Sequence, residues 1–448
     1  MTFNEFKELV IAECAARGIT EYELYYQAGS NTSVDTFQHE INEFSSALAG
    51  GVCFRCIVNG KMGYASTEDL SAEQAAQVVV KAADNASVLE AEEQVFLGEG
   101  GQEYEPLELE QYDLPSTEEL ISTVLETTEK IYAADPAVID GSQTQGIMES
   151  GEMAIYNSKG LDLHHTYNAT GLIVVGVVTD GKEMSNDYQI KLGKLDEIDV
   201  DKMVAKAVSE AKVKLGGEVA PTGQYPVVFS PDAMCSLLQV FNSIFNSENA
   251  QKGLSKLASS EGQVIAAPCV TLMDDPFYKE NPEPRNFDAE GSPTHKKAVI
   301  ENGVLNTLLY NLKTAAVAGK KTTGNASKAG YDSPVGIRPF TMYLAAGDKT
   351  EEELLAKAGN GVYITDLSGL HAGANPISGD FSLQSAGYMI EDGKKAGYVK
   401  AFTVAGNFYE VLKNIDSLSD KVVLPMAMGM TAFGSPSVRV DGLSIAGK

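Results

Sequence analysis

The chain repeats one local pattern, in which two strand-like runs are joined by Asn-Gly or Asp-Gly. The dipeptide occurs at residues 59–60, 180–181, 302–303 and 392–393. Asn-Gly and Asp-Gly tolerate the positive φ angles of two-residue turns, so each site predicts an antiparallel hairpin. Helix-like stretches with N-cap patterns lie between the hairpins, as at residues 71–74 and 116–119. Hairpins mixed with helices predict an α+β fold rather than a doubly wound parallel sheet.

Two breaks divide the 448 residues, a length that suits two or three domains. Residues 92–115 contain eight acidic residues and two prolines, and are expected to form an exposed, extended connection. Residues 215–223 (LGGEVAPTG) form the second break. We therefore expect an N-terminal α+β domain over residues 1–220 and a C-terminal domain, rich in β-hairpins, over residues 221–448.

The composition excludes several classes of function. Asp and Glu outnumber Lys and Arg by 62 to 34, which gives a net charge of −28. Such a surface repels phosphate backbones, so direct nucleic-acid binding is not expected. The chain has no apolar run long enough to span a membrane. Thr2–Glu5 resembles a helix capping box rather than a signal peptide, and a cytoplasmic location is expected.

Cysteine and histidine form no established metal or redox motif. Cys53 and Cys56 have CxxC spacing within a strand-like run, where residues i and i+3 point to opposite faces, so structural cysteines are favoured. His39-Glu40 begins like HExxH, but position 43 is glutamate. The adjacent His164 and His165 are expected on opposite faces of a strand, and His295 in solvent. No GxSxG or Walker A motif occurs.

Acidic residues gather at four neighbouring positions of the C-terminal half. These are Asp274, Asp275, Asp288 and Glu290. Such carboxylates could hold a cation or clamp a substrate. Solvated loop charges are the alternative in so acidic a chain.

Residues 366–415 carry the most distinctive loop of the chain. The run from Gly369 to Pro376 is too rich in Gly, Asn and Pro to be helix or strand. A hairpin and a helix from about Asn407 follow. His371 lies within the loop, near Asp366 and Asp380, and is the one histidine that we consider as a functional residue. A surface Ω-loop is the alternative.

A helix is predicted from Ser230, since Ser230-Pro231-Asp232 combines an N-cap serine, a proline at N1 and an acid in the first turn. Its apolar stripe predicts core packing, and consists of Met234, Leu237, Leu238, Phe241, Ile244 and Phe245.

The chain resembles the TldD/PmbA family, also called the modulator of DNA gyrase family. The matching stretches are residues 51–69, 270–305, 323–326, 370–415 and 437–443. They span nearly the whole chain, and the blocks at 286–305 and 370–415 are long enough to be specific. The resemblance implies a zinc metallopeptidase system that acts on peptides or unfolded proteins.

The resemblance also implies two kinds of subunit. The TldD kind carries HExxxH before a Lys-Gly-like turn and takes a further zinc ligand from a cysteine near its C-terminus. Counted back from Lys252-Gly253, the motif positions fall on Leu238, Gln239 and Ser243, and residues 428–436 contain no cysteine. Leucine cannot bind zinc, so the chain resembles the PmbA (TldE) kind. No metal or other cofactor is expected in this chain, and zinc is expected in a TldD-type partner.

The favoured hypothesis is a non-catalytic partner in a TldD-type peptidase, paired with a TldD-type subunit or with a second copy of itself. Its loop and hairpin could then bind a peptide by β-augmentation, in a groove formed by Gly369, His371, Gly373, Asn375 and Ser378. A second hypothesis is a homo-oligomeric metallopeptidase with a relocated site, built from His371, Asp380, Glu290 or Asp288. A third is a regulatory protein that acts on DNA gyrase through protein contacts.

Overall fold

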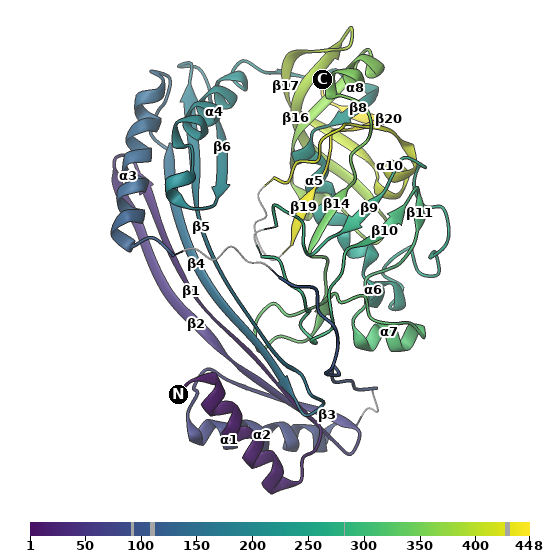
Figure 1. Ribbon diagram of the computed structural model, residues 1–448. Coiled ribbons are helices and arrows are strands. Elements are labelled where there is room, and N and C mark those ends of the chain that lie inside the picture. Colours follow the sequence, from purple (N-terminus) through teal and green to yellow (C-terminus); the bar gives the residue numbers. More distant parts are fainter. Residues whose placement is uncertain (91–93, 108–112, 282, 426–430) are drawn as a thin grey trace.

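The N-terminal half is built on one long antiparallel sheet. The computed structural model describes residues 1–90, 94–107, 113–281, 283–425 and 431–448. The sheet has the order β3-β2-β1-β4-β5-β6, and Figure 1 shows it curving past the C-terminal half. Its strands are β1 (Tyr22–Phe37), β2 (Glu40–Val58), β3 (Lys61–Thr67), β4 (Gln143–Asn157), β5 (Asp162–Thr179) and β6 (Met184–Leu192).

Two helix pairs pack on one face of this sheet, at its two ends (Figure 1). Helices α1 (Phe3–Arg17) and α2 (Ala72–Val88) cover Leu24 and Phe54 at one end. Helices α3 (Thr117–Ala134) and α4 (Val200–Val213), the latter preceded by the short 3₁₀ helix η1 (Leu195–Glu197), cover Val34 and Leu172 at the other. The middle of the same face, around Ala28 and Ser30 of β1, lies between the pairs.

The local signals of the sequence are confirmed. The predicted turns join β2 to β3, β5 to β6, β10 to β11 and β16 to β17, and Asn59, Asn302 and Asp392 adopt φ angles of 48–51°. Thr2 and Ser116 form complete capping boxes, and the Ser71 side chain accepts a hydrogen bond from the Gln74 backbone. An α+β fold results, as predicted.

A seven-stranded sheet forms most of the C-terminal half. Its order is β18-β20-β8-β15-β16-β17-β7, and β20 also pairs with β17, so five of the strands close into a ring. The strands are β7 (Glu218–Val219), β8 (Gly223–Phe229), β15 (Gly361–Ser368), β16 (Asp380–Glu391), β17 (Lys394–Asn407), β18 (Ile415–Leu418) and β20 (Val438–Ala446).

A five-stranded sheet and several short elements complete this half. The order β11-β10-β9-β14-β19 joins β9 (Leu272–Asp274), β10 (Lys297–Glu301), β11 (Val304–Leu305), β14 (Thr341–Leu344) and β19 (Ala432–Gly434), beside a small pair formed by β12 (Ala326–Ser327) and β13 (Gly336–Ile337). The helices are α5 (Pro231–Phe241), η2 (Asn242–Phe245), α6 (Ser247–Gln251), α7 (Leu312–Ala318), α8 (Glu351–Ala358), α9 (Leu370–Gly373) and α10 (Phe408–Asn414). No helix in the described ranges is long and apolar enough to cross a membrane.

The described residues of the acidic connection, 94–107 and 113–115, contain no helix or strand. Part of the connection departs from the expected exposure, because Leu97 is buried. Asn157 donates a side-chain hydrogen bond to the Gly98 carbonyl at 2.8 Å, and the Tyr104 hydroxyl donates to the Gly291 carbonyl at 2.8 Å. The connection therefore ties the long sheet to the C-terminal half.

Candidate functional site

Helix α5 carries two of the three positions that the resemblance assigns to HExxxH. The Ser230 side chain accepts a hydrogen bond from the Ala233 backbone, and Pro231 stands in the first turn, as predicted. Leu238 is 0% exposed and packs in the main core, whereas Gln239 is exposed. The α-helix ends at Phe241, earlier than the apolar stripe suggested, so Ser243 lies in the 3₁₀ helix η2.

This donor set does not fit a zinc ion. A catalytic zinc needs three protein ligands with nitrogen, oxygen or sulfur donors, and Leu238 has no donor atom in its side chain. Across the described ranges, no three His, Cys, Asp or Glu side chains are grouped as metal ligands. Residues 428–430 of the C-terminal segment that lacks cysteine lie outside the described residues.

The loop before β16 is exposed and locally braced. Leu370–Gly373 form one helical turn, contrary to the prediction that this run contains no helix, because Gly369 adopts φ 75° and the Gly373 amide donates to its carbonyl at 2.8 Å. The Asn375 side chain accepts hydrogen bonds from the Ile377 and Ser378 backbones. A polar surface loop results.

Among the described residues, no hydrogen bond or ion pair links the predicted catalytic groups His371 and Asp380 to each other. His371 and Asp380 are both exposed. Asn407 donates a side-chain hydrogen bond to Asp380 at 2.8 Å, which lowers the pKa of that carboxyl. Asp366 instead lies 3.8 Å from the Lys214 ammonium. Of the five predicted groove residues, Gly373 and Asn375 line a shallow hollow.

The hairpin β16–β17 has little edge left for an added strand. β16 lies between β15 and β17. β17 also pairs with β7 at residues 399–400 and with β20 at residues 403–405. These pairings leave residues 394–398 as the longest stretch of β17 with a single strand neighbour among the described residues, and the predicted β-augmentation by this hairpin stays a prediction.

The four neighbouring carboxylates are buried, so the alternative of solvated loop charges is wrong for them. Asp274 is fully buried and accepts hydrogen bonds from the Lys297 ammonium at 3.0 Å, the Asn325 amide at 2.7 Å and the Phe340 backbone at 2.8 Å. Asp275 pairs with Lys296 at 3.0 Å. With these partners, Asp274 and Asp275 act as structural groups.

Glu290 lies where the long sheet meets the C-terminal half. It lines a cavity of about 360 Å³ together with Arg55 of β2, Phe96 of the connection and Lys252 after α6. The buried Arg55 donates to Glu23 at 2.7 Å.

The three candidate catalytic residues occupy two places: His371 and Asp380 lie at the loop, and Glu290 lies at this junction. Sequence patterns did not reveal Arg55, because its partner Glu23 is identified only by the register of β1 and β2.

Burial and the nearby Asp288 carboxylate raise the pKa of Glu290 to about 7. Burial also raises the pKa of Asp288. Asp288 nevertheless accepts three backbone hydrogen bonds, from Glu290, Ser292 and Ala326, which favour its charged form. The charge of Asp288 in turn disfavours ionisation of Glu290.

A pH dependence of stability follows from Glu290. Folding raises the pKa of such a carboxyl. Its contribution to stability is fully present at pH values below the pKa in the unfolded state, and it is lost as the pH rises through the pKa in the folded state. We expect the stability of the wild type relative to Glu290→Gln to fall between about pH 4.5 and 7. Urea unfolding of both proteins across this range measures the difference, and parallel pH profiles would contradict the assignment.

The cysteine and histidine predictions are confirmed in their geometry. Cys53 and Cys56 pack in different clusters on opposite faces of the sheet, and both are free. His164 is exposed, 2.8 Å from Glu152, whereas His165 is buried. Burial lowers the pKa of His165 to about 4, so this ring is neutral. His295 is exposed, as expected.

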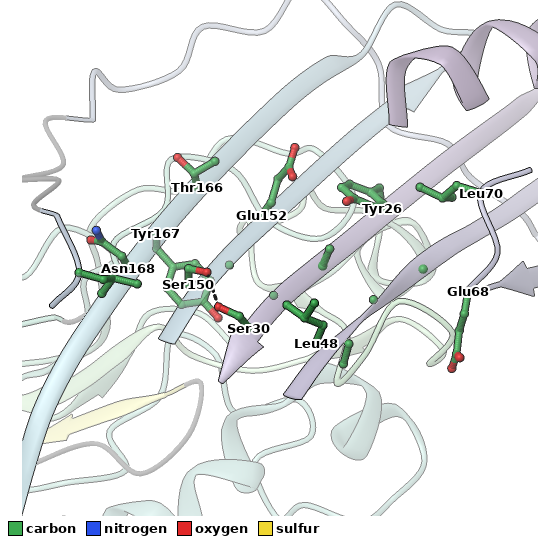
Figure 2. A pocket seen from close by; sticks show the side chains of 17 residues that line it. Tyr26, Ser30, Leu48, Glu68, Leu70, Ser150, Glu152, Thr166, Tyr167 and Asn168 are labelled. Carbon is green, nitrogen blue, oxygen red and sulfur yellow. Dashed lines mark hydrogen bonds between the residues drawn. The ribbon is translucent and has the colours of Figure 1, made fainter. Parts of the chain in front are cut away.

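A trough crosses the middle of the long sheet, between the two helix pairs, and sequence patterns gave no sign of it. It measures about 690 Å³. Figure 2 shows its lining, with Glu68 and Leu70 toward one end, Leu48 beside Ser30 in the middle and Asn168 at the other end. The face of the sheet is hollowed here because small residues lie at matching positions of neighbouring strands, and the Ser30 and Ser150 hydroxyls are 2.7 Å apart.

Family models match three successive parts of the chain. They are described as PmbA/TldA metallopeptidase domain 1, over residues 22–86, the central domain, over residues 111–215, and the C-terminal domain, over residues 222–447. A Methanothermobacter thermautotrophicus protein named metalloprotease is 26% identical over 432 residues, which cover 91% of each chain.

Two solved structures share the fold. A Thermotoga maritima protein, described as a candidate modulator of a DNA gyrase, is 30% identical with a TM-score of 0.89, over 99% of this chain and 100% of that chain. TldE from Thermococcus kodakarensis is 23% identical with a TM-score of 0.88, over 98% of this chain and 99% of that chain. With family models covering most of its length, the chain belongs to the TldD/PmbA family of metallopeptidases.

Proposed function

We propose that this chain is the non-catalytic subunit of a TldD/PmbA-type peptidase, in which a TldD-type partner supplies the zinc centre. The observation that carries the proposal is helix α5, where a fully buried leucine, Leu238, occupies the position of the first motif histidine. Hydrolysis by a zinc peptidase needs a metal to activate water and a base to take its proton. Leu238 and Gln239 supply neither.

The likeness of the fold to a protein named TldE supports a heteromeric assembly. The role left to this chain is to bind the peptide substrate for the TldD-type subunit. The buried Asp274 and Arg55 hold its own framework together, and neither offers an open metal position.

Co-expression with a TldD-type subunit tests this role. We expect a stable complex that cleaves a fluorogenic peptide faster than the TldD-type subunit alone, while the present chain alone is inactive. Replacing the glutamate of HExxxH in the partner by glutamine should abolish cleavage. Gln239→Ala in this chain is the matched control and should leave cleavage unchanged. The lack of any complex or stimulation would refute the proposal.

A further inference from the structure

One edge of the long sheet is open along half of strand β2. β2 pairs with β1 from Glu40 to Cys56, but its pairing with β3 begins only at Val52. Within the described residues, the stretch from Glu43 to Gly51 therefore has a strand neighbour on one side only. Its register with β1 is unbroken, since the one irregularity lies between Asp35 and Thr36. Figure 1 shows β2 along the outer side of the sheet.

This edge lacks the usual protection against an incoming strand. Natural edges are blunted by lysine, proline, bulges or short length, and the stretch 43–51 (EFSSALAGG) contains neither lysine nor proline. Phe44 and Leu48 are 48% and 88% exposed. They face the same side of the sheet, because residues four apart in a strand do so. The remaining side chains are mostly small, which leaves the backbone accessible.

The trough lies directly beside this edge. Leu48, Gly50 and Gly51 line it on β2, and Glu68 and Leu70, which follow the end of β3, line it beyond β2 (Figure 2). β3 ends at Thr67, opposite Val52. An added strand would continue the line of β3 along β2, and alternate side chains would lie over the trough.

The charge around the edge favours one kind of added strand over another. Glu43 lies on the edge, and Glu68 and Glu152 line the trough. A second copy of this chain also carries a net charge of −28, which opposes self-association. A peptide with basic side chains meets favourable charge instead.

We propose that the edge Glu43–Gly51 binds an extended, basic peptide segment as an additional strand. The inference rests on the proposed function, since it names the place where the non-catalytic subunit holds peptide. Main-chain hydrogen bonds would supply sequence-tolerant affinity, and Phe44 and Leu48 would contact alternate apolar side chains.

Binding of a labelled peptide of about ten alternating valine and lysine residues, followed by fluorescence anisotropy, tests the proposal on the full chain. Two N-methylated versions carry the methyl groups on alternate residues, in opposite phase. In a strand, successive N–H groups point to opposite sides, so one phase should abolish binding and the other should preserve it. Equal affinity of the two phases would overturn the proposal.

A matched pair of variants locates the site. Leu48→Lys should weaken binding by at least about tenfold, the level of an interface hot spot, whereas Val317→Lys, at another exposed apolar position (63% exposed), should not. Both positions are exposed, so both proteins should fold. Unchanged affinity in Leu48→Lys, or dimerisation through this edge without peptide binding, would refute the proposal. If the edge binds peptide but the chain never stimulates a TldD-type subunit, the proposed function fails while this inference stands.

Discussion

Replacing Arg55 by methionine is expected to lower the free energy of unfolding by about 3–5 kcal/mol, the cost of removing one member of a buried ion pair. The guanidinium is buried against Glu23 and beside Glu290. Its loss leaves the buried Glu23 carboxylate without its counter-charge. Urea unfolding, followed by circular dichroism, measures the change.

The double variant Arg55→Met, Glu23→Gln is the control for this effect. Because it removes the charge of both partners, it should recover most of the lost stability, as apolar or neutral replacements of buried pairs often do. A loss below about 1 kcal/mol in the single variant, the range of exposed ion pairs, would show that Arg55 does not anchor this junction.

Asp274→Ala is the second substitution with a large expected effect, also about 3–5 kcal/mol. Asp274 accepts hydrogen bonds from Lys297, Asn325 and the Phe340 backbone. Removal of the carboxylate leaves the buried Lys297 ammonium without its counter-charge. It also removes the acceptor of one Asn325 N–H and of the Phe340 backbone N–H.

The neighbouring Asp275→Ala serves as the comparison. Its partner Lys296 is 56% exposed, and an ion pair with so exposed a partner contributes roughly 0–1 kcal/mol, so this variant should lose clearly less stability. The difference between the two proteins in thermal or urea unfolding checks the prediction. Equal losses would contradict the role of Asp274 as the central acceptor.

Local chemistry predicted the local structure. The turn dipeptides and N-cap residues act within a few positions of the chain, and the hairpins and helix starts formed where they were expected. Long-range pairing was not accessible in the same way. That β16–β17 is closed by β20, while half of β2 stays open, depends on strands distant in sequence.

The burial of these charged side chains could not be predicted from the sequence either. Nothing in the residues around Asp274 or Glu290 distinguishes a solvated loop from a buried network. Lys297, the partner of Asp274, lies 23 positions away. Arg55, which lines the same cavity as Glu290, belongs to the long sheet. The altered motif on α5, in contrast, could be identified from the sequence resemblance, and the structure adds that Leu238 belongs to the core.

The most direct test of the non-catalytic role is zinc quantification by mass spectrometry on the purified chain, on the TldD-type subunit and on their complex, each with a peptide cleavage assay. The account predicts zinc in the TldD-type subunit, no stoichiometric zinc in this chain, and cleavage only where the TldD-type subunit is present. Stoichiometric zinc in this chain alone, lost together with peptide cleavage in His371→Ala, would contradict it.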